Sequence, residues 1–151
     1  MDETDETMTE LTSRQCWDLL ASTDVGRLAV NVDGTPDIFP VNYVVANGTV
    51  VFRTAPGRKH VPIRRADHVA LEIDHVDRES GLAWSVVAKG RARDVSSEPE
   101  LSYVRGLPLR PMHGSAKAIF VRLEPDLVTG RSFVTASPQR WEGPDGLASA
   151  R

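Results

Sequence analysis

The chain has 151 residues, of which 40% are hydrophobic and 26% charged, and its net charge is −3. This composition is that of one ordinary globular domain, and it excludes disorder as the main state of the chain. The slight excess of acidic residues provides no global field to attract nucleic acid or anionic lipid. We therefore expect no nucleic-acid partner and no membrane partner.

The single cysteine, Cys16, cannot form an internal disulfide, and no apolar run approaches the roughly 20 residues that cross a bilayer. The first ten residues, MDETDETMTE, are acidic, unlike the basic start of a signal peptide. We expect a cytoplasmic protein with a disordered acidic tail, one domain and a loose C-terminal tail, over residues 1–10, 11–136 and 137–151.

The chain alternates between strand and helix patterns. Apolar residues with the period of a half-buried strand recur in six segments, 26–32, 37–46, 49–54, 68–74, 82–95 and 116–134. Helical patterns with capping residues or an early proline occupy three shorter segments, 11–22, 62–65 and 96–107. In the first of these, Thr12 and Gln15 have the spacing of a capping box.

The connections favour antiparallel pairing. Asp33-Gly34 and Asn47-Gly48 are typical hairpin turns. Pro40 has no N–H for a ladder, so its strand is expected to have an edge, a bulge or an end there, and Gly90 is a plausible bend. Six strands with short helices predict a mainly β fold, a closed or nearly closed antiparallel barrel. An open α+β sheet is the alternative.

Residues 52–60, FRTAPGRKH, bring cationic side chains, a hydroxyl and free N–H groups to the end of a strand and the start of a helix. This combination suits a phosphate, carried here by Arg53, Thr54, Arg58 and Lys59. The alternative is a basic turn exposed to solvent. Because cations at a helix start oppose the helix dipole, an anionic partner is favoured.

Other reactive side chains indicate little chemistry. The histidines and the one cysteine lack the spacing of a metal site, so no metal is expected. Ser85, Ser115 and Cys16 lack the context of a hydrolase nucleophile. Trp84 and Ser85 lie on opposite faces of a strand, where the indole is either a core residue or a flat binding surface.

In this order, the segments resemble the pyridoxamine 5′-phosphate oxidase-like family of FMN-binding split barrels, from Leu11 to Val134. The resemblance is carried by VGRLAV, DGTPDIFPVNYVV, NGTVVFRTAPGRK, VALEID and WSVVAKGRARDV. It implies a homodimer in which two six-stranded barrels pack together and hold two equivalent flavin sites at their interface.

The resemblance also implies site residues. The FMN phosphate would be held by Arg53, Thr54, Arg58 and Lys59. The strand along the isoalloxazine ring would contribute Pro40, Val41, Asn42 and Tyr43. The partner subunit would reach the cofactor through Trp84 and Ser85, and a late segment would approach it with Gly130 and Arg131.

The function implied is an FMN-dependent oxidoreductase with an unidentified small-molecule substrate, in which the flavin performs the electron or hydride transfer. No catalytic residue is assigned. True pyridoxamine phosphate oxidases bind their substrate through a C-terminal arginine-containing segment, which RWEGPDGLASAR resembles only faintly at Arg140 and Trp141, so oxidation of vitamin B6 phosphates is not the activity expected. Two alternatives stay open: a reductase using the deazaflavin coenzyme F-420, whose anionic tail would meet Arg64 and Arg65, and a non-catalytic flavin- or haem-binding carrier or sensor.

Overall fold

The computed structural model describes residues 8–57, 60–109 and 119–135. Within these ranges the chain forms seven strands and three short helices. Their bounds in chain order are β1 (Met8–Glu10), α1 (Ser13–Ser22), β2 (Val25–Val32), β3 (Thr35–Ala46), β4 (Thr49–Thr54), α2 (His60–Arg65), β5 (Val69–Val76), β6 (Leu82–Asp94), α3 (Glu100–Arg105) and β7 (Ile119–Val134).

The sheet closes on itself. Its strand order is β1-β7-β4-β3-β2-β5-β6, every pairing is antiparallel, and β7 also pairs with β6. Strands β2 to β7 therefore form a six-stranded ring, to which β1 adds at the outer edge of β7. This confirms the predicted barrel with short helices and excludes the open α+β sheet.

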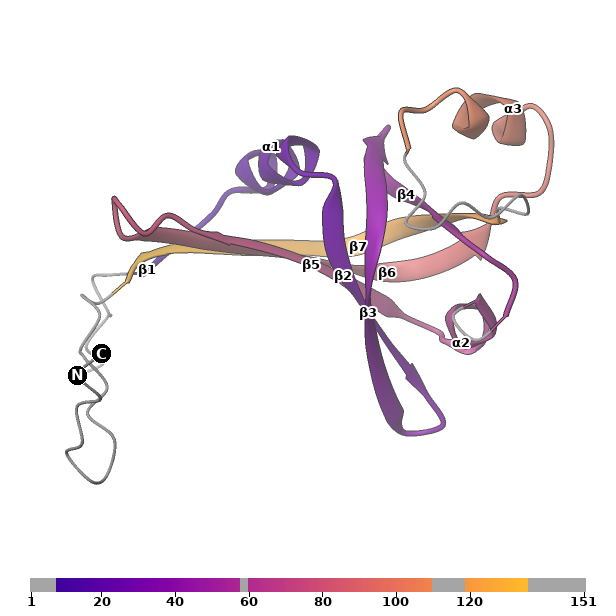
Figure 1. Cartoon of the computed structure of the whole chain (residues 1–151), viewed down its shortest axis with the longest axis horizontal. Helices are drawn as coiled ribbons and strands as arrows, with labels where there is room; N and C mark the ends of the chain where they lie inside the picture. Colours follow the sequence, from indigo (N-terminus) through magenta and orange to yellow (C-terminus); the bar gives the residue numbers. More distant parts are fainter. Residues whose placement is uncertain (1–7, 58–59, 110–118, 136–151) are drawn as a thin grey trace, which may run out of the picture.

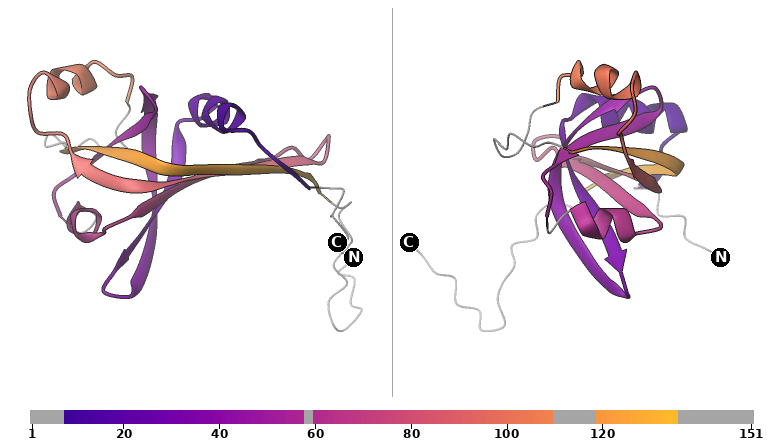
Figure 2. Two further views of the ribbon diagram at one scale, coloured as in Figure 1. Left: turned by 180° about the vertical axis from the view of Figure 1, so that it is seen from behind. Right: turned by 90° about the vertical axis from the view of Figure 1, so that its right-hand side faces the viewer.

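Strands β5, β6 and β7 continue beyond the ring as a long arm, and α1 lies across one face of it (Figures 1 and 2). β1 pairs with the arm end of β7, where Met8 is opposite Phe133. Met8–Glu10 thus form a strand within the segment for which the sequence predicts a tail. Residues 1–7 and 137–151 lie outside the described ranges.

Local sequence explains α1 and the hairpins. Thr12 caps α1: its hydroxyl accepts from the Gln15 backbone N–H, and the Gln15 side chain accepts from the Thr12 N–H, which confirms the capping box. In the two predicted turns all four residues adopt a positive φ, as hairpin turns of this kind require: Asp33, Gly34, Asn47 and Gly48.

Two predicted irregularities are confirmed. Pro40 pairs with Arg27 of β2, whereas the β3–β4 ladder includes only the last residues of β3, starting at Tyr43. Among the described residues no strand pairs with the other edge of Pro40. At Gly90 the β6–β7 register shifts, so that Asp126 has no partner in the ladder. This is a β-bulge, and it bends the arm out of the barrel.

Side chains pack in two clusters. The larger fills the ring and continues under α1, and it contains Leu20, Leu28, Phe52 and Leu71. The smaller lies outside the barrel, between α3 and the outer face of β3 and β4. Helix α3 is also held by ion pairs from Glu100 to Arg93 and to the buried Arg122. Ser97 and Glu100 have the sequence spacing of a capping pattern, but the helix begins after Pro99 and no side chain caps it.

Candidate functional site

The site predicted from the sequence begins where β3 and β4 separate. Tyr43 pairs with Phe52 at the end of their ladder, and both side chains are buried in the barrel. Because side chains alternate along a strand, Asn42 and Arg53 point to the outer face. Beyond this pair the two strands diverge (Figure 1). Where β3 and β4 diverge, the edges of the two strands and the side chains that point outward from them lie next to one another.

Arg53 has the strongest sign of a missing partner. Its guanidinium carbon lies 5.4 Å from the ring centroid of Phe120 on β7. Its Nε is buried and has no hydrogen-bond partner among the described residues. A buried donor without an acceptor costs about 1–3 kcal/mol, so a ligand oxygen at this position would relieve a real penalty. An anionic group such as a phosphate therefore fits this place.

Near Arg53, the hydroxyl of Thr54 lies 3.4 Å from the carbonyl oxygen of Ala55, a weak contact that leaves it able to donate to a ligand. The turn residues Ala55, Pro56 and Gly57 are exposed. Arg58 and Lys59, the other two predicted phosphate ligands, lie outside the described residues. The structure thus brings two of the four predicted phosphate ligands to one strand end.

The predicted ring strand presents two kinds of side chain. Val41 and Tyr43 are buried, and the Tyr43 hydroxyl donates to the carbonyl of Leu20 at 2.6 Å. Burial raises the pKa of this phenol. These two residues can therefore meet a ligand on the outer face only through their backbone. Pro40 and Asn42 face outward, so their side chains can contact it.

Trp84 and Ser85 lie on the arm and point to opposite faces. Trp84 packs against the larger core cluster, with its ring centroid 6.1 Å from that of His75. Ser85 pairs with Arg131 on the outer face, where Arg131 is exposed. The indole thus has a structural role in this chain, and the hydroxyl is the member of the pair that faces the outer surface.

Gly130 has a packing role of its own. A Cβ at this position would come within 2.8 Å of the Cys16 sulfur and 3.1 Å of the Ser85 carbonyl oxygen. The missing side chain is what allows α1 to approach the arm. Burial raises the pKa of the Cys16 thiol, which lies under the helix.

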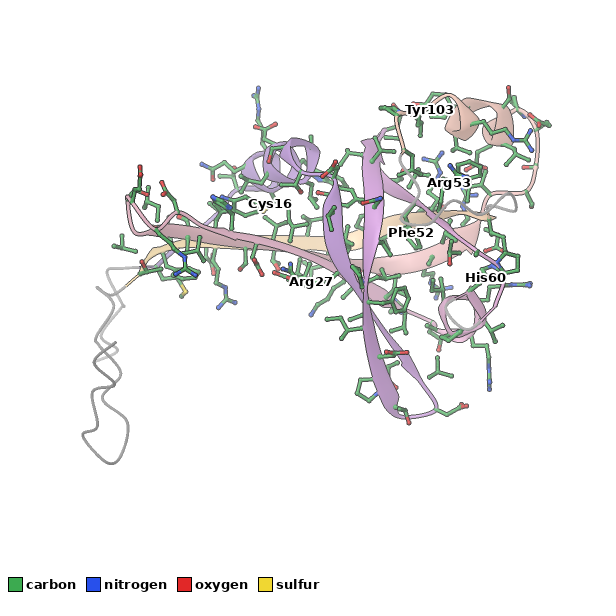
Figure 3. The ribbon with its side chains drawn as sticks, viewed as in Figure 1. Cys16, Arg27, Phe52, Arg53, His60 and Tyr103 are labelled. Atoms are coloured by element: carbon green, nitrogen blue, oxygen red, sulfur yellow. The ribbon has the colours of Figure 1, made fainter. Side chains whose placement is uncertain are left out.

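Within one chain, the predicted site residues at the end of β4 are far from those on the arm. Arg53 pairs with Phe120 near the start of β7, and Arg131 is near its end. At about 3.3 Å per residue, this stretch of β7 is about 35 Å long. Figure 3 shows Arg53 at the barrel end of the molecule and Cys16 over the arm. One chain therefore does not assemble all the predicted residues around a single ligand.

The outer face also carries charges that sequence reasoning missed. Arg27 Nη1 lies 3.4 Å from Glu72 and 3.6 Å from Asp74, and Arg27 pairs directly with Pro40 on β3. Partial burial and the neighbouring Asp74 carboxylate raise the pKa of Glu72 to about 7, although Arg27 opposes the shift. The sequence signal that could have revealed this charge cluster is the spacing of Glu72 and Asp74, which lie two positions apart and therefore on one face of the strand.

Sequence reasoning also missed a contact between α2 and the barrel. The Nε2 atom of the buried His60 is 2.9 Å and 3.1 Å from the two carboxylate oxygens of Asp94. Arg64 Nε approaches the same carboxylate at 3.6 Å. Next to this pair is a depression of about 300 Å³, lined by His60, Val61, Arg64 and Arg65.

Two further findings apply to the described part of the chain. No three His, Cys, Asp or Glu side chains gather there in a way that could hold a metal ion. No helix there is both long and apolar enough to span a bilayer.

A closed six-stranded antiparallel barrel with a basic strand end on its outer face defines a split-barrel protein. The family model for pyridoxamine 5′-phosphate oxidase matches residues 12–132. The chain belongs to this family. An uncharacterized protein of Mycobacterium tuberculosis is 35% identical over 133 residues, which cover 85% of this chain and 87% of that protein.

Two solved structures extend the similarity. An FAD binding protein from Mycobacterium smegmatis is 41% identical, with a TM-score of 0.72 over 83% of this chain and 98% of that one. An FAD-binding protein from Mesorhizobium loti is 25% identical, with a TM-score of 0.72 over 86% of this chain and 99% of that one.

Proposed function

We propose that this protein is a flavin-dependent oxidoreductase that holds its cofactor between two copies of the chain and acts on a small-molecule substrate. The buried, unpartnered Nε of Arg53 carries the proposal, because it marks a place for an anion at the strand end predicted to bind phosphate. The FAD-binding proteins from Mycobacterium smegmatis and Mesorhizobium loti support a flavin.

The residues present fit such a cofactor. Arg53 and Thr54 would hold the phosphate, together with Arg58 and Lys59, the other two ligands that the family resemblance implies. The ring would lie on the outer face over Pro40, where no strand of the described ranges pairs with the second edge of β3. When bound, a flavin supplies electron or hydride transfer. The chain's own part is to bind and orient the ring and to exclude water from one side of it.

We infer the need for a second copy of the chain from the distance between Arg53 and Arg131. The stretch of about 35 Å between Phe120 and Arg131 exceeds the length of an FMN molecule. If both Arg53 and Arg131 serve a flavin, they serve different ones, and each site needs the arm of a partner. Apolar side chains exposed on the same outer face support its burial against a second copy: Val25, Ile38 and Leu127.

The first experiment is the visible absorption spectrum of purified protein, before and after addition of FMN, FAD, coenzyme F-420 and haem in parallel. A flavin band that shifts on binding supports the proposal. A preference for the deazaflavin would indicate that the same site binds coenzyme F-420 instead of a flavin. A haem band would favour the carrier or sensor function. Bound flavin without turnover by any electron donor would also favour a carrier. No binding by any of the four would contradict the proposal.

The Arg53→Gln substitution tests the phosphate site directly. Charge-assisted hydrogen bonds contribute about 1.5–3 kcal/mol each, so FMN affinity should fall about ten- to a hundredfold, as measured by fluorescence quenching. Riboflavin, which has the same ring and no phosphate, serves as the matched ligand, and its affinity should not change. Equal loss for both ligands would indicate that Arg53 shapes the barrel and does not bind phosphate.

A further inference from the structure

Two arginines lie side by side on the outer face of the barrel, and their surroundings differ. Arg53 pairs with Phe120 across the β4–β7 ladder, and Arg122 lies two positions further along β7, so the two arginines are diagonal neighbours. Arg122 is buried, its Nε donates to Glu100 at 2.9 Å, and its Nη1 donates to the Thr49 hydroxyl at 2.6 Å. These partners give Arg122 a structural role, because they hold α3 and the start of β4 together.

Arg53 has a different environment. No carboxylate of the described ranges forms an ion pair with it, and its buried Nε has no hydrogen-bond partner there. Instead, its guanidinium carbon lies over the ring of Phe120, 5.4 Å from the centroid, within the range of a cation–π interaction. Because a phenyl ring has no strong hydrogen-bond acceptor, it attracts the cation and leaves the N–H donors to an anion.

Phe120 is itself fixed by the fold. Its side chain packs against the smaller core cluster, which contains Val51 of β4 and Val104 of α3. Its carbonyl oxygen accepts from the Val95 N–H at 2.8 Å, so its backbone is also held where β6 ends. A ring held through both its side chain and its backbone limits the places that the guanidinium over it can occupy.

We propose that Phe120 is a positioning residue, which holds the Arg53 guanidinium at the end of β4 before the flavin phosphate arrives. The proposal rests on the flavin site proposed above and deepens it, because it assigns part of the phosphate affinity to a side chain that does not touch the phosphate. An arginine on a free stem loses side-chain entropy when it binds. An arginine already held over a ring has lost much of that freedom, and such preorganisation increases affinity.

The first test measures FMN and riboflavin affinity by fluorescence quenching in two variants of Phe120. Phe120→Leu removes the aromatic face and keeps an apolar side chain. FMN affinity should fall about three- to tenfold, the size of a partly desolvated cation–π contact, with riboflavin affinity unchanged. Phe120→Tyr keeps the ring and should retain FMN affinity. The control variant Tyr103→Leu removes an exposed ring from α3 and should change neither affinity.

A double-mutant cycle separates positioning from a direct contact between Phe120 and the ligand. If the ring acts only through Arg53, adding Phe120→Leu to Arg53→Gln should cause no further loss of FMN affinity. Additive losses in the double variant would show that Phe120 acts on the flavin by itself, which would overturn the positioning role.

A spectroscopic test uses the unaltered chain, so it does not depend on whether a Phe120 variant folds. The Arg53 Nε–H is followed by NMR of flavin-free, nitrogen-15-labelled protein. Because this group is buried next to the ring, its proton should exchange slowly with water and show a nuclear Overhauser contact with Phe120. FMN should shift the signal more than riboflavin does. A rapidly exchanging Nε–H without that contact would mean that Arg53 is not held in advance.

The outcomes separate this proposal from the proposed function. If the unaltered chain does not bind FMN, or if Arg53→Gln weakens FMN and riboflavin equally, the phosphate site is wrong and the positioning role is wrong with it. If Arg53→Gln weakens FMN alone while Phe120→Leu changes nothing, only the positioning role is overturned. If Phe120→Leu weakens both ligands equally, or if Phe120→Tyr loses as much FMN affinity as Phe120→Leu, the aromatic face does not position Arg53.

Discussion

At the scale of single residues, the fold strongly changes the ionisation of Glu72. It shares the outer face of β5 with Asp74, and both carboxylates approach one guanidinium, that of Arg27. Partial burial and the second carboxylate disfavour its charged form, which raises its pKa to about 7. With a pKa of about 7, the Glu72 carboxyl is protonated in part near neutral pH, on the face proposed to contact the ring.

This shift predicts a pH dependence of stability. Because the pKa of Glu72 is higher in the folded chain than its ordinary value of 4.5, the folded state binds this proton more tightly. The contribution is fully present below pH 4.5 and is lost as the pH rises through about 7. The free energy of unfolding should fall over this range, as measured by urea denaturation at several pH values.

The control for this prediction is Glu72→Gln, which cannot ionise and still fills the same space. Its unfolding free energy should depend less on pH between 4.5 and 7 than that of the unaltered chain. Identical slopes in the two proteins would show that Glu72 titrates normally and that Arg27 compensates for the neighbouring carboxylate.

At the scale of elements, the long pair β6–β7 connects the barrel with the arm. The bulge at Gly90 and Asp126 allows β6 and β7 to belong to both the barrel and the arm, because it changes the direction of the ladder without ending the pairing. Gly90 is needed there for a steric reason: a Cβ would collide with the backbone of Glu124 and Pro125.

The substitution Gly90→Ala should therefore destabilise the fold. Forcing an added methyl group into a closely packed site costs about 1–3 kcal/mol, and here the obstacle is backbone that cannot rotate away. The matched control is Gly106→Ala after α3, where φ is −84° and the nearest atom to a new Cβ is 3.4 Å away. Urea denaturation should show a clear loss for the first variant only; equal effects would mean that the bulge adapts.

At the scale of the whole molecule, the proposed site depends on two copies of the chain, since the barrel end and the arm of one chain lie far apart. This predicts complementation between two defective variants, Arg53→Gln and Arg131→Gln. In a mixed dimer one site carries both substitutions and the other carries neither. With random mixing, about a quarter of all sites should regain normal FMN affinity.

The complementation experiment requires that the two variants exchange subunits, for example by refolding together from urea. Flavin titration should then show a tight fraction that is absent from each variant alone. A mixture that behaves as the sum of its parts would place both arginines at the same chain's cofactor, or Arg131 outside the site. Sedimentation of the unaltered chain at several concentrations would separate these cases.

Much of the fold was predictable because its signals are local. Asn47-Gly48 adopts a positive φ wherever it makes a tight hairpin, and Thr12 caps whatever helix follows it. Arg53 was also visible in sequence as a cation at a strand end, which makes it a candidate phosphate ligand. The hydrogen-bonded pair of His60 and Asp94 was not, because its members are far apart in the chain and approach only when α2 packs against the barrel.

By itself, then, the sequence determined the six strands of the barrel, their hairpin turns, the opening helix and the basic strand end, since each follows from side-chain alternation or backbone preference within a few residues. Only the tertiary structure decided that β6 and β7 close the ring and extend into an arm. It alone packed Trp84 against the core and turned Ser85 outward, and it placed Arg131 far from Arg53. Strand register fixes these relations, and register depends on packing across the whole sheet.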